Sequence, residues 1–497
     1  MCGIAGFCNF KEDFEENTDY WNFRLEKMRA VLAHRGNDAR GRFLKKHIGL
    51  SHSRLAIRDI LCGDQPMTRT HNGYDYTICY NGEIYNTDEL IPELSENGFV
   101  CSTTSDTEVI LYAYIHWGAD FVNRLNGIFA FAIWDTAKNR LLLYRDRVGV
   151  KPLFYAIRGD SLVFGSEPKA CFAHPAVKPE LDKQGLQELL AIGPAHTSGL
   201  SLFKDLFEVL PGHFMIYSQN GLHDETYWEL TSREHTESYQ DTVAHTRFLV
   251  EDAIKRQMVS DVPVCTFLSG GIDSSIVTAI AANYMNTRGK TLNTFSFDFK
   301  DNDRYFKANA FQPERDLPYV NRMLEEYETA HSYLECDENS LFKALFAAVD
   351  AKDMPGMTDV DSSLLYFCSL VSRKNKVALT GECADEIFGG YPWFYRKELL
   401  ERYGFPWSSD VAPRLALLRD DVGLELDLSG YQAFRYEESR SKAPLLYGEA
   451  GEDESRRIIG YLNIKWFMQT LLDRMDRTSM YSELEARVPF ADHRIIE

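Results

Sequence analysis

The sequence of 497 residues lacks several features that mark common protein classes. Its 10 cysteines include no CxxC pair, so neither a zinc site nor a disulfide framework is indicated. No apolar run approaches the ~20 residues that cross a membrane, and no basic segment followed by an apolar one opens the chain. We therefore expect free thiols, no membrane partner and a cytoplasmic location.

Positive charge is also scarce. Lysine and arginine total 54 against 74 acidic residues, which gives a net charge of −20. Nucleic-acid binding requires a basic face, so we expect no nucleic-acid partner. The chain is too long for a single hydrophobic core, while its 44% apolar content is ordinary for a globular protein. These values predict two domains.

The densest polar motif is SGGIDSS, at residues 269–275. The apolar run Val262–Leu268 predicts a buried strand before it, and Ile276–Met285 predicts a helix after it. A glycine turn at a helix N-terminus can bind an anion, and no lysine follows as it would in a nucleoside-triphosphate loop. A simple capped turn is the alternative, but the cluster exceeds what capping needs. It predicts a pyrophosphate cradle with glycine, hydroxyl and carboxylate contributions from Ser269, Gly270, Gly271, Asp273, Ser274 and Ser275.

A second apolar strand, VALT at Val377–Thr380, runs into the acidic turn GECADEIFGG. Its carboxylates Glu382, Asp385 and Glu386 would repel one another unless they share a cation. An acidic cap on the following helix is the alternative. The alternation of strands and helices from Asp241 onward predicts an α/β domain with a nucleotide at the carboxyl ends of a parallel sheet.

The chain opens with MCGIAGF. Removal of Met1 would leave Cys2 with both a thiol and a free α-amine. An amine with a pKa near ~8 can accept the thiol proton and so activate the nucleophile. The alternative is a buried structural cysteine at the start of a strand.

Three further motifs supply what a thiolate needs to attack an amide substrate. HSRLAIRD predicts a short strand carrying Arg54, and YNGEIYN, after the strand YDYTICY, offers Asn81 and Gly82 as donors. TSDTEVIL predicts a helix capped by Ser105 or Asp106. Together they provide an oxyanion hole, an arginine for a carboxylate and an acid for an ammonium group. Each motif by itself is also a common turn or cap.

The residues of these motifs and their order along the chain resemble those of a known family. MCGIAGF, HRGND, HSRLAI, YNGEIYN, TSDTEV, LNGIFAFAIWD, RDRVGVKPLFY and FGSEPKA resemble the glutaminase half of class II glutamine amidotransferases. SGGIDSS and GECADEIFGGYPW extend the resemblance to the glutamine-hydrolysing asparagine synthetases, over essentially the whole chain.

This resemblance implies a two-domain α/β protein. Residues 1–228 would form a glutaminase domain with an Ntn-hydrolase-like α/β/β/α sandwich. Residues 229–240 would be a linker, and residues 241–497 an ATP-pyrophosphatase-type domain with a parallel sheet. Relatives continue beyond the segment that matches HRIIE, so we expect the C-terminal part of the second domain to be missing and the chain to form a homodimer as many relatives do.

In the first domain the resemblance implies that Cys2 forms a glutamyl thioester and releases ammonia, with Asn81 and Gly82 as the oxyanion hole. The family usually reads HRGPD, so Asn37 in place of proline is expected to affect loop rigidity. The glutamine-binding groups implied are Arg54 for the α-carboxylate, Glu83 and Asp106 for the α-amine, and the backbone of Leu55, Ala56, Ile57 and Arg58.

In the second domain the resemblance implies ATP and Mg²⁺ as ligands and aspartate as the acceptor. Glu382 would act in formation of the acyl-adenylate and its attack by ammonia, and Asp273 and Asp385 would hold Mg²⁺. The nucleotide-contacting positions implied are Leu268, Ser269, Gly270, Gly271, Asp273, Ser274, Ser275, Phe297, Thr380 and Gly381.

The acceptor is less directly indicated. The Thr-Thr-x-Arg run that many members use for aspartate is absent, and Asp359, Asp361 and Ser362 stand in that region. Amidation of another carboxylate, lactam formation and a glutaminase-only protein are the alternatives. The resemblance also implies an ammonia tunnel between the domains, and purely structural contacts for Asp476, Ser479, Glu485 and Arg487.

Overall fold

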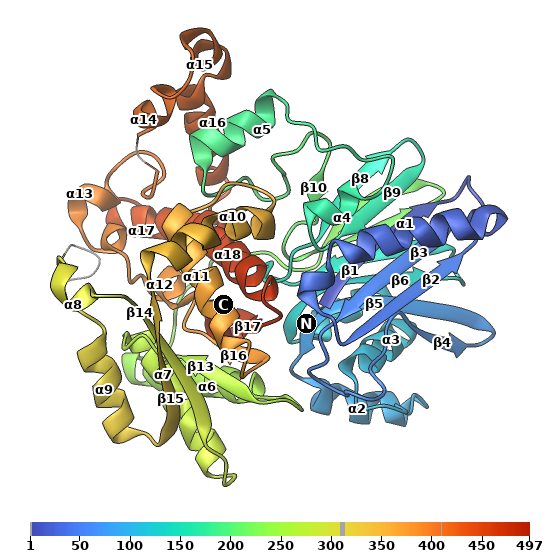
Figure 1. Ribbon diagram of the computed structural model, residues 1–497, viewed down its shortest axis with the longest axis horizontal. Helices are drawn as coiled ribbons and strands as arrows, with labels where there is room; N and C mark the ends of the chain where they lie inside the picture. The colour runs from blue at the N-terminus through green and yellow to red at the C-terminus, as the bar shows by residue number, and fades with distance from the viewer. Residues whose placement is uncertain (1, 309–313, 409) are drawn as a thin grey trace.

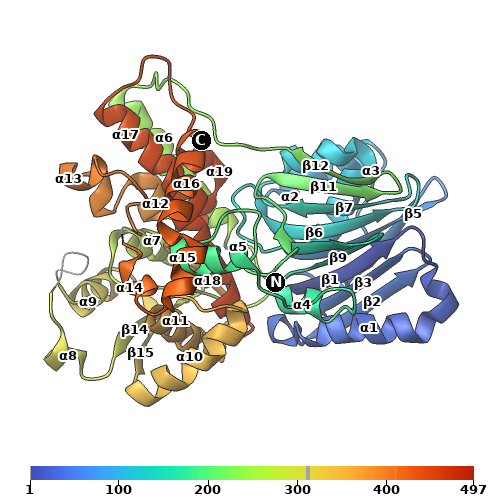
Figure 2. The same cartoon turned by 90° about the horizontal axis from the view of Figure 1, so that it is seen from above.

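The computed structural model describes residues 2–308, 314–408 and 410–497. It consists of two domains side by side, with the N-terminus at their junction (Figures 1 and 2). The connection from the last N-terminal strand to the first helix of the second domain crosses one side of the molecule in Figure 2.

The N-terminal domain contains two stacked antiparallel sheets of six strands each. The first sheet has the order β10 (Phe207–Glu208), β8 (Phe154–Arg158), β9 (Ser161–Gly165), β1 (Cys2–Asn9), β3 (Ile48–Arg54) and β2 (Ala39–Lys45). The second has the order β12 (Gly221–Thr226), β11 (His213–Ser218), β7 (Arg140–Arg145), β6 (Gly127–Asp135), β5 (Tyr74–Ile84) and β4 (Met67–His71).

Helices cover the outer faces of both sheets. Helices α1 (Thr18–Ala30) and α4 (Pro168–Phe172) pack on the first sheet, and α2 (Thr87–Glu96) and α3 (Asp106–Trp117) on the second. Strand β1 shows why this arrangement is stable: Ile4 and Cys8 face the core between the sheets, while Ala5 and Phe7 face α1. A strand buried on both faces is apolar throughout. The predicted α/β/β/α sandwich is confirmed.

The second domain is built on a parallel sheet of five strands, also as predicted. Its order is β15 (Thr329–Cys336), β14 (Leu292–Phe299), β13 (Val264–Phe267), β16 (Val377–Leu379) and β17 (Glu485–Arg487). The strands of this sheet contact helices α7 (Ile272–Asn286), α11 (Thr358–Val371) and α18 (Met468–Met480). Helix α6 (Tyr239–Arg256) packs on α7, and α10 (Glu338–Lys352) packs on α11 and α18.

Two expected boundaries differ from the structure. Helix α7 begins at Ile272, four residues before the expected start at Ile276, because the IDSS segment already forms its first turn. Helix α6 begins at Tyr239, within the expected linker 229–240, because the Ser238 side chain accepts a hydrogen bond from the Asp241 N–H and caps the helix.

A continuous apolar core joins the two domains. Leu55, Ile57 and Tyr85 of the first domain belong to the same buried cluster as Leu472 and Phe490 of the second. The segment that follows Arg54 is therefore packed against the second domain.

Two broader expectations can be compared with the structure. The ten cysteines all lie in its described part and are unpaired. Among the described residues, no helix has both the length and the hydropathy required to cross a membrane.

Candidate active sites

Cys2 is buried at the start of β1, and Arg35 links its carbonyl to Asp476 of the second domain. The backbone nitrogen of Cys2 donates to Asn81 Oδ1 at 2.9 Å. Burial raises the pKa of the thiol, although the Leu55 N–H and the charge of Arg54 lower it. The thiol therefore needs an adjacent base to become a thiolate. Met1, whose removal would expose the α-amine of Cys2 as that base, lies outside the described residues.

Asn81 has the geometry of an oxyanion-hole donor. Its Nδ2 is buried without a hydrogen-bond partner in the structure, and a buried unpaired donor is costly unless a ligand satisfies it. The neighbouring Gly82 is required by space, since a Cβ there would lie 2.2 Å from the Ile128 carbonyl oxygen. Both residues lie within β5 and not after it, so the predicted end of this strand was wrong: β5 continues to pair with β6 as far as Ile84.

Arg54 is the last residue of β3, paired directly with Cys2. The expected strand over His52–Asp59 was therefore too long. The Arg54 side chain explains the end of the strand, since Nη1 donates to Asp64 at 2.9 Å and Nη2 to the Asp59 carbonyl at 2.6 Å. These bonds fold residues 55–64 into a loop beside the nucleophile, and the Ala56 N–H donates to Asp38 at 2.8 Å.

The two candidate acids for an ammonium group, Glu83 and Asp106, lie on β5 and at the start of α3. Glu83 shares a face of β5 with Asn81, because side chains two residues apart on a strand point the same way. Its carboxylate contacts Arg58 and Arg487 at 3.3 Å each. Asp106 lies at the N-terminus of α3, which Ser105 caps as predicted, and accepts from the Tyr80 hydroxyl at 2.8 Å.

The HRGND segment connects this site to the second domain. Arg35 is fully buried; its Nε donates to the Cys2 carbonyl at 3.0 Å and its Nη2 to Asp476 at 2.8 Å. Asp476 also pairs with Lys151 at 3.0 Å. Asn37, which stands where the family usually has proline, donates from its side chain to Glu483. The loop is thus attached to the second domain by side-chain contacts.

The SGGIDSS segment follows β13, with residues 269–271 in the turn and residues 272–275 in the first turn of α7. Gly270 has φ +84°, a conformation that favours glycine, and a Cβ there would lie 2.8 Å from Tyr319 Cβ. The Ser274 hydroxyl contacts the Ser269 hydroxyl at 3.0 Å and the Gly271 carbonyl at 3.1 Å, which closes the loop. The N-terminal N–H groups of α7 are thereby presented to an anion.

The acidic turn lies beside this loop because β13 and β16 are neighbouring parallel strands. Burial and repulsion from Asp385 raise the pKa of Asp273 to about 6. Burial and repulsion from Glu382 raise that of Asp385. No described cluster of three or more His, Cys, Asp or Glu side chains is arranged to hold a metal. Two carboxylates that repel each other nevertheless suit Mg²⁺, which is commonly held by one or two carboxylates and substrate phosphates.

These groups surround a cavity of about 410 Å³. Of the candidate nucleotide and metal positions, Leu268, Gly270, Ser275 and Phe297 are not part of its lining; Leu268 is buried, and Phe297 packs against Phe367. The candidate residues that line the cavity are Ser269, Gly271, Asp273, Ser274, Thr380, Gly381, Glu382 and Asp385.

Sequence reasoning missed two polar residues of this cavity. Arg474, on α18, donates to Glu382 at 2.9 Å, and Tyr391 donates to Glu386 at 2.5 Å. Arg474 lies in the segment LLDRMDRTSM and Tyr391 in GGYPW, but the direction of these side chains toward the cavity depends on tertiary packing. In the region where the Thr-Thr-x-Arg run is absent, Asp361 accepts a hydrogen bond from the Met357 N–H at 2.8 Å, at the start of α11.

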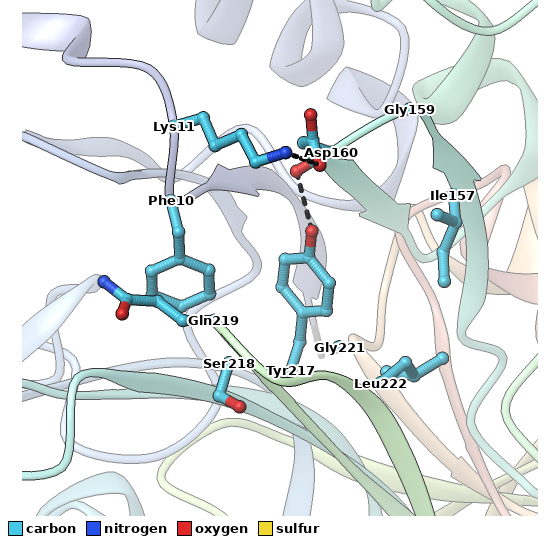
Figure 3. Close-up of a pocket in the computed structure, with 10 residues that line it drawn as sticks. All are labelled: Phe10, Lys11, Ile157, Gly159, Asp160, Tyr217, Ser218, Gln219, Gly221 and Leu222. Atoms are coloured by element: carbon cyan, nitrogen blue, oxygen red, sulfur yellow. Dashed lines mark hydrogen bonds and ion pairs between the residues drawn. The ribbon is translucent and has the colours of Figure 1, made fainter.

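A separate cavity of about 420 Å³ lies on the first domain, beside the turns that join β8 to β9 and β11 to β12 (Figure 3). Its charged side chains, Lys11 and Asp160, pair with each other at 2.8 Å. Tyr217 donates to the Asp160 carbonyl at 2.6 Å. None of its lining residues is a candidate site residue.

Comparison with known proteins adds independent information. Residues 1–228 match the model of a glutamine amidotransferase domain and residues 245–497 that of asparagine synthase. Glutamine-hydrolysing asparagine synthetase 3 of Bacillus subtilis is 48% identical over all of this chain and 80% of its own length. A putative glutamine-hydrolysing asparagine synthetase 2 of Methanocaldococcus jannaschii is 32% identical over 79% of this chain and 76% of its own.

Proposed function

This chain belongs to the asparagine synthase family, and we propose that it makes L-asparagine from L-aspartate, L-glutamine and ATP, with glutamate, AMP and pyrophosphate as the other products. The observation that carries this proposal is the presence of two distinct sites in one chain. One holds a buried thiol beside an unpaired amide donor, and the other holds a glycine–serine loop beside an acidic turn.

In the first site we assign amide attack to Cys2. The α-amine exposed by removal of Met1 would accept the thiol proton, and the thiolate would attack the glutamine side-chain carbonyl. Asn81 Nδ2 and the Gly82 N–H would stabilise the oxyanion. Collapse of the tetrahedral intermediate releases ammonia and leaves a glutamyl thioester, which water hydrolyses to glutamate.

In the second site the aspartate side-chain carboxylate would attack the α-phosphorus of ATP. The SGGIDSS loop would hold the departing pyrophosphate with its N–H groups and hydroxyls. Ammonia would then attack the β-aspartyl-AMP and displace AMP. We assign to Glu382, which accepts a hydrogen bond from Arg474, the role of receiving a proton from the attacking ammonia.

Mg²⁺ fits the second site, where Asp273 and Asp385 would hold it. The ion would neutralise charge on the polyphosphate.

Ammonia must also travel between the sites without being protonated, and the apolar cluster that joins the domains supports a water-poor route. The unpaired thiols of the protein support a reducing compartment such as the cytoplasm, where we place the enzyme. We also propose that the protein forms a homodimer, as many relatives do.

Transfer of ¹⁸O from the aspartate side chain to AMP tests whether an acyl-adenylate is formed. The protein is incubated with ATP, Mg²⁺, glutamine and aspartate labelled with ¹⁸O in its side-chain carboxylate. Attack on the α-phosphorus places one ¹⁸O atom in each AMP formed. AMP without label, or ADP and phosphate as the nucleotide products, would contradict the proposal. Parallel reactions with other carboxylates test the alternative acceptors.

A further inference from the structure

Glu83 is shared between the two domains. It lies on β5 with only 3% of its surface exposed, and each carboxylate oxygen contacts a different arginine. Arg58 Nη1, from the same domain, is 3.3 Å from Oε1. Arg487 Nη2, from the second domain, is 3.3 Å from Oε2.

Arg487 is held rigidly by its own domain. Its side chain is fully buried, with Nη1 donating to the Gln257 and Val259 carbonyls at 2.6 and 2.5 Å and Nε to Glu485 at 2.5 Å. Its backbone carbonyl accepts from the Thr380 N–H at 3.0 Å, in the turn that leads to Glu382. The rigid fork of the guanidinium thus leaves Nη2 directed at Glu83.

We propose that Arg487 is a positioning residue for glutamine, reaching from the synthetase domain to hold the Glu83 carboxyl group in place for the substrate ammonium group. This inference rests on the proposed function and on Glu83 as a glutamine-binding residue. The two arginine contacts use one lone pair on each carboxylate oxygen, and the remaining lone pairs can accept from the ammonium.

The charges around Glu83 explain why it needs a second arginine. Burial, with repulsion from Asp106 and Glu485, raises its pKa to about 8 even though the charges of Arg487 and Arg58 lower it. Tyr80 and Tyr85 also face this group. Loss of Arg487 removes a charge that lowers the pKa, so the carboxyl would stay protonated to higher pH. The ion pair between this carboxyl group and the substrate ammonium would therefore form only at higher pH in the variant than in the wild type.

The test compares Arg487→Lys and Arg487→Met with the wild type in glutamine hydrolysis and in synthesis from added ammonia. We expect the KM for glutamine at pH 7 to rise roughly tenfold or more, since one charged contact contributes about 1.5–3 kcal/mol. The kcat should change less than threefold, and the acidic limb of kcat/KM should move to higher pH. Ammonia-dependent synthesis, which reports an intact fold, should stay within threefold.

Arg477→Lys is the matched control. Arg477 is also a fully buried arginine of the second domain, but it pairs with Asp353 and contacts none of the glutamine-site candidates. If its variant raises the KM for glutamine as much as Arg487→Lys does, the effect is structural and the inference is overturned.

A double-mutant cycle keeps the test decisive if Arg487→Met does not fold. In a Glu83→Gln background, Arg487→Lys should cause no further rise in the KM for glutamine, because its target is already neutral. Additive losses would overturn the inference. A wild-type protein that does not hydrolyse glutamine refutes the proposed function itself, whereas an active wild type with unaffected Arg487 variants refutes only this inference.

Discussion

Asp476 provides a test of how the two domains are joined. It lies on α18 with 1% of its side chain exposed and pairs with two fully buried cations of the first domain, Arg35 and Lys151. Asp476→Asn keeps the shape of the side chain but removes the charge that both cations share. Loss of one partner from a buried ion pair costs about 3–5 kcal/mol.

The expected effect is large enough to measure by thermal unfolding. At about 2–4 °C per kcal/mol for domains of this size, Asp476→Asn should lower the unfolding midpoint by roughly 6–20 °C. The matched control is Glu93→Gln, which removes the charge from a surface pair with Arg124 in which both side chains are nearly half exposed. Such pairs contribute about 0–1 kcal/mol.

Activity gives a second result from the same variant. Arg35 also holds the Cys2 carbonyl, so its displacement should reduce glutamine-dependent synthesis more than ammonia-dependent synthesis. An Asp476→Asn protein as stable as Glu93→Gln, with both activities unchanged, would refute the view that this buried network joins the domains.

Other consequences can be measured directly. Cys2→Ala should abolish glutamine-dependent synthesis and spare synthesis from ammonia, and retained activity with glutamine would remove the thiol from the mechanism. Asp273→Ala should lower synthesis from either nitrogen source at least a hundredfold without affecting glutaminase activity; unchanged turnover would reject its assignment to the Mg²⁺–ATP site. Gly270→Ala should weaken ATP binding more than tenfold, because its φ and the contact with Tyr319 leave no room for a Cβ, and normal binding in calorimetry would contradict this. Burial opposes ionisation of Asp476, but Arg35 and Lys151 outweigh it and lower its pKa, so its contribution is present above about pH 4 and lost as pH falls through the lowered value. The stability gap between wild type and Asp476→Asn should therefore shrink below about pH 4, and a gap independent of pH would show that the charge is not responsible.

Local chemistry made much of the second site predictable. SGGIDSS and GECADEIFGG each follow an apolar strand, and the carboxyl ends of neighbouring parallel strands necessarily lie together. Cys2, Arg54 and Asn81 were also predictable as candidates, because the family motifs contain them. The structure brings all three together at the junction of two sheets.

The contacts that join the sites were not predictable in the same way. Arg487 and Glu83 are separated by 404 positions, and Arg35 and Asp476 by 441. No periodicity in either segment indicates such a partner, since the pairing follows only from how the domains pack. Strand ends were uncertain for a related reason: β3 ends at Arg54 because of that side chain's bonds to a later loop.

The most direct test of the central claim follows nitrogen through both sites. Wild-type protein is supplied with ATP, Mg²⁺, aspartate and glutamine labelled with ¹⁵N in the side-chain amide, in the presence of unlabelled ammonium. We expect asparagine that carries the label, formed in equal amounts with AMP and pyrophosphate. Asparagine with only unlabelled nitrogen, or glutamine hydrolysis without any AMP, would contradict the account.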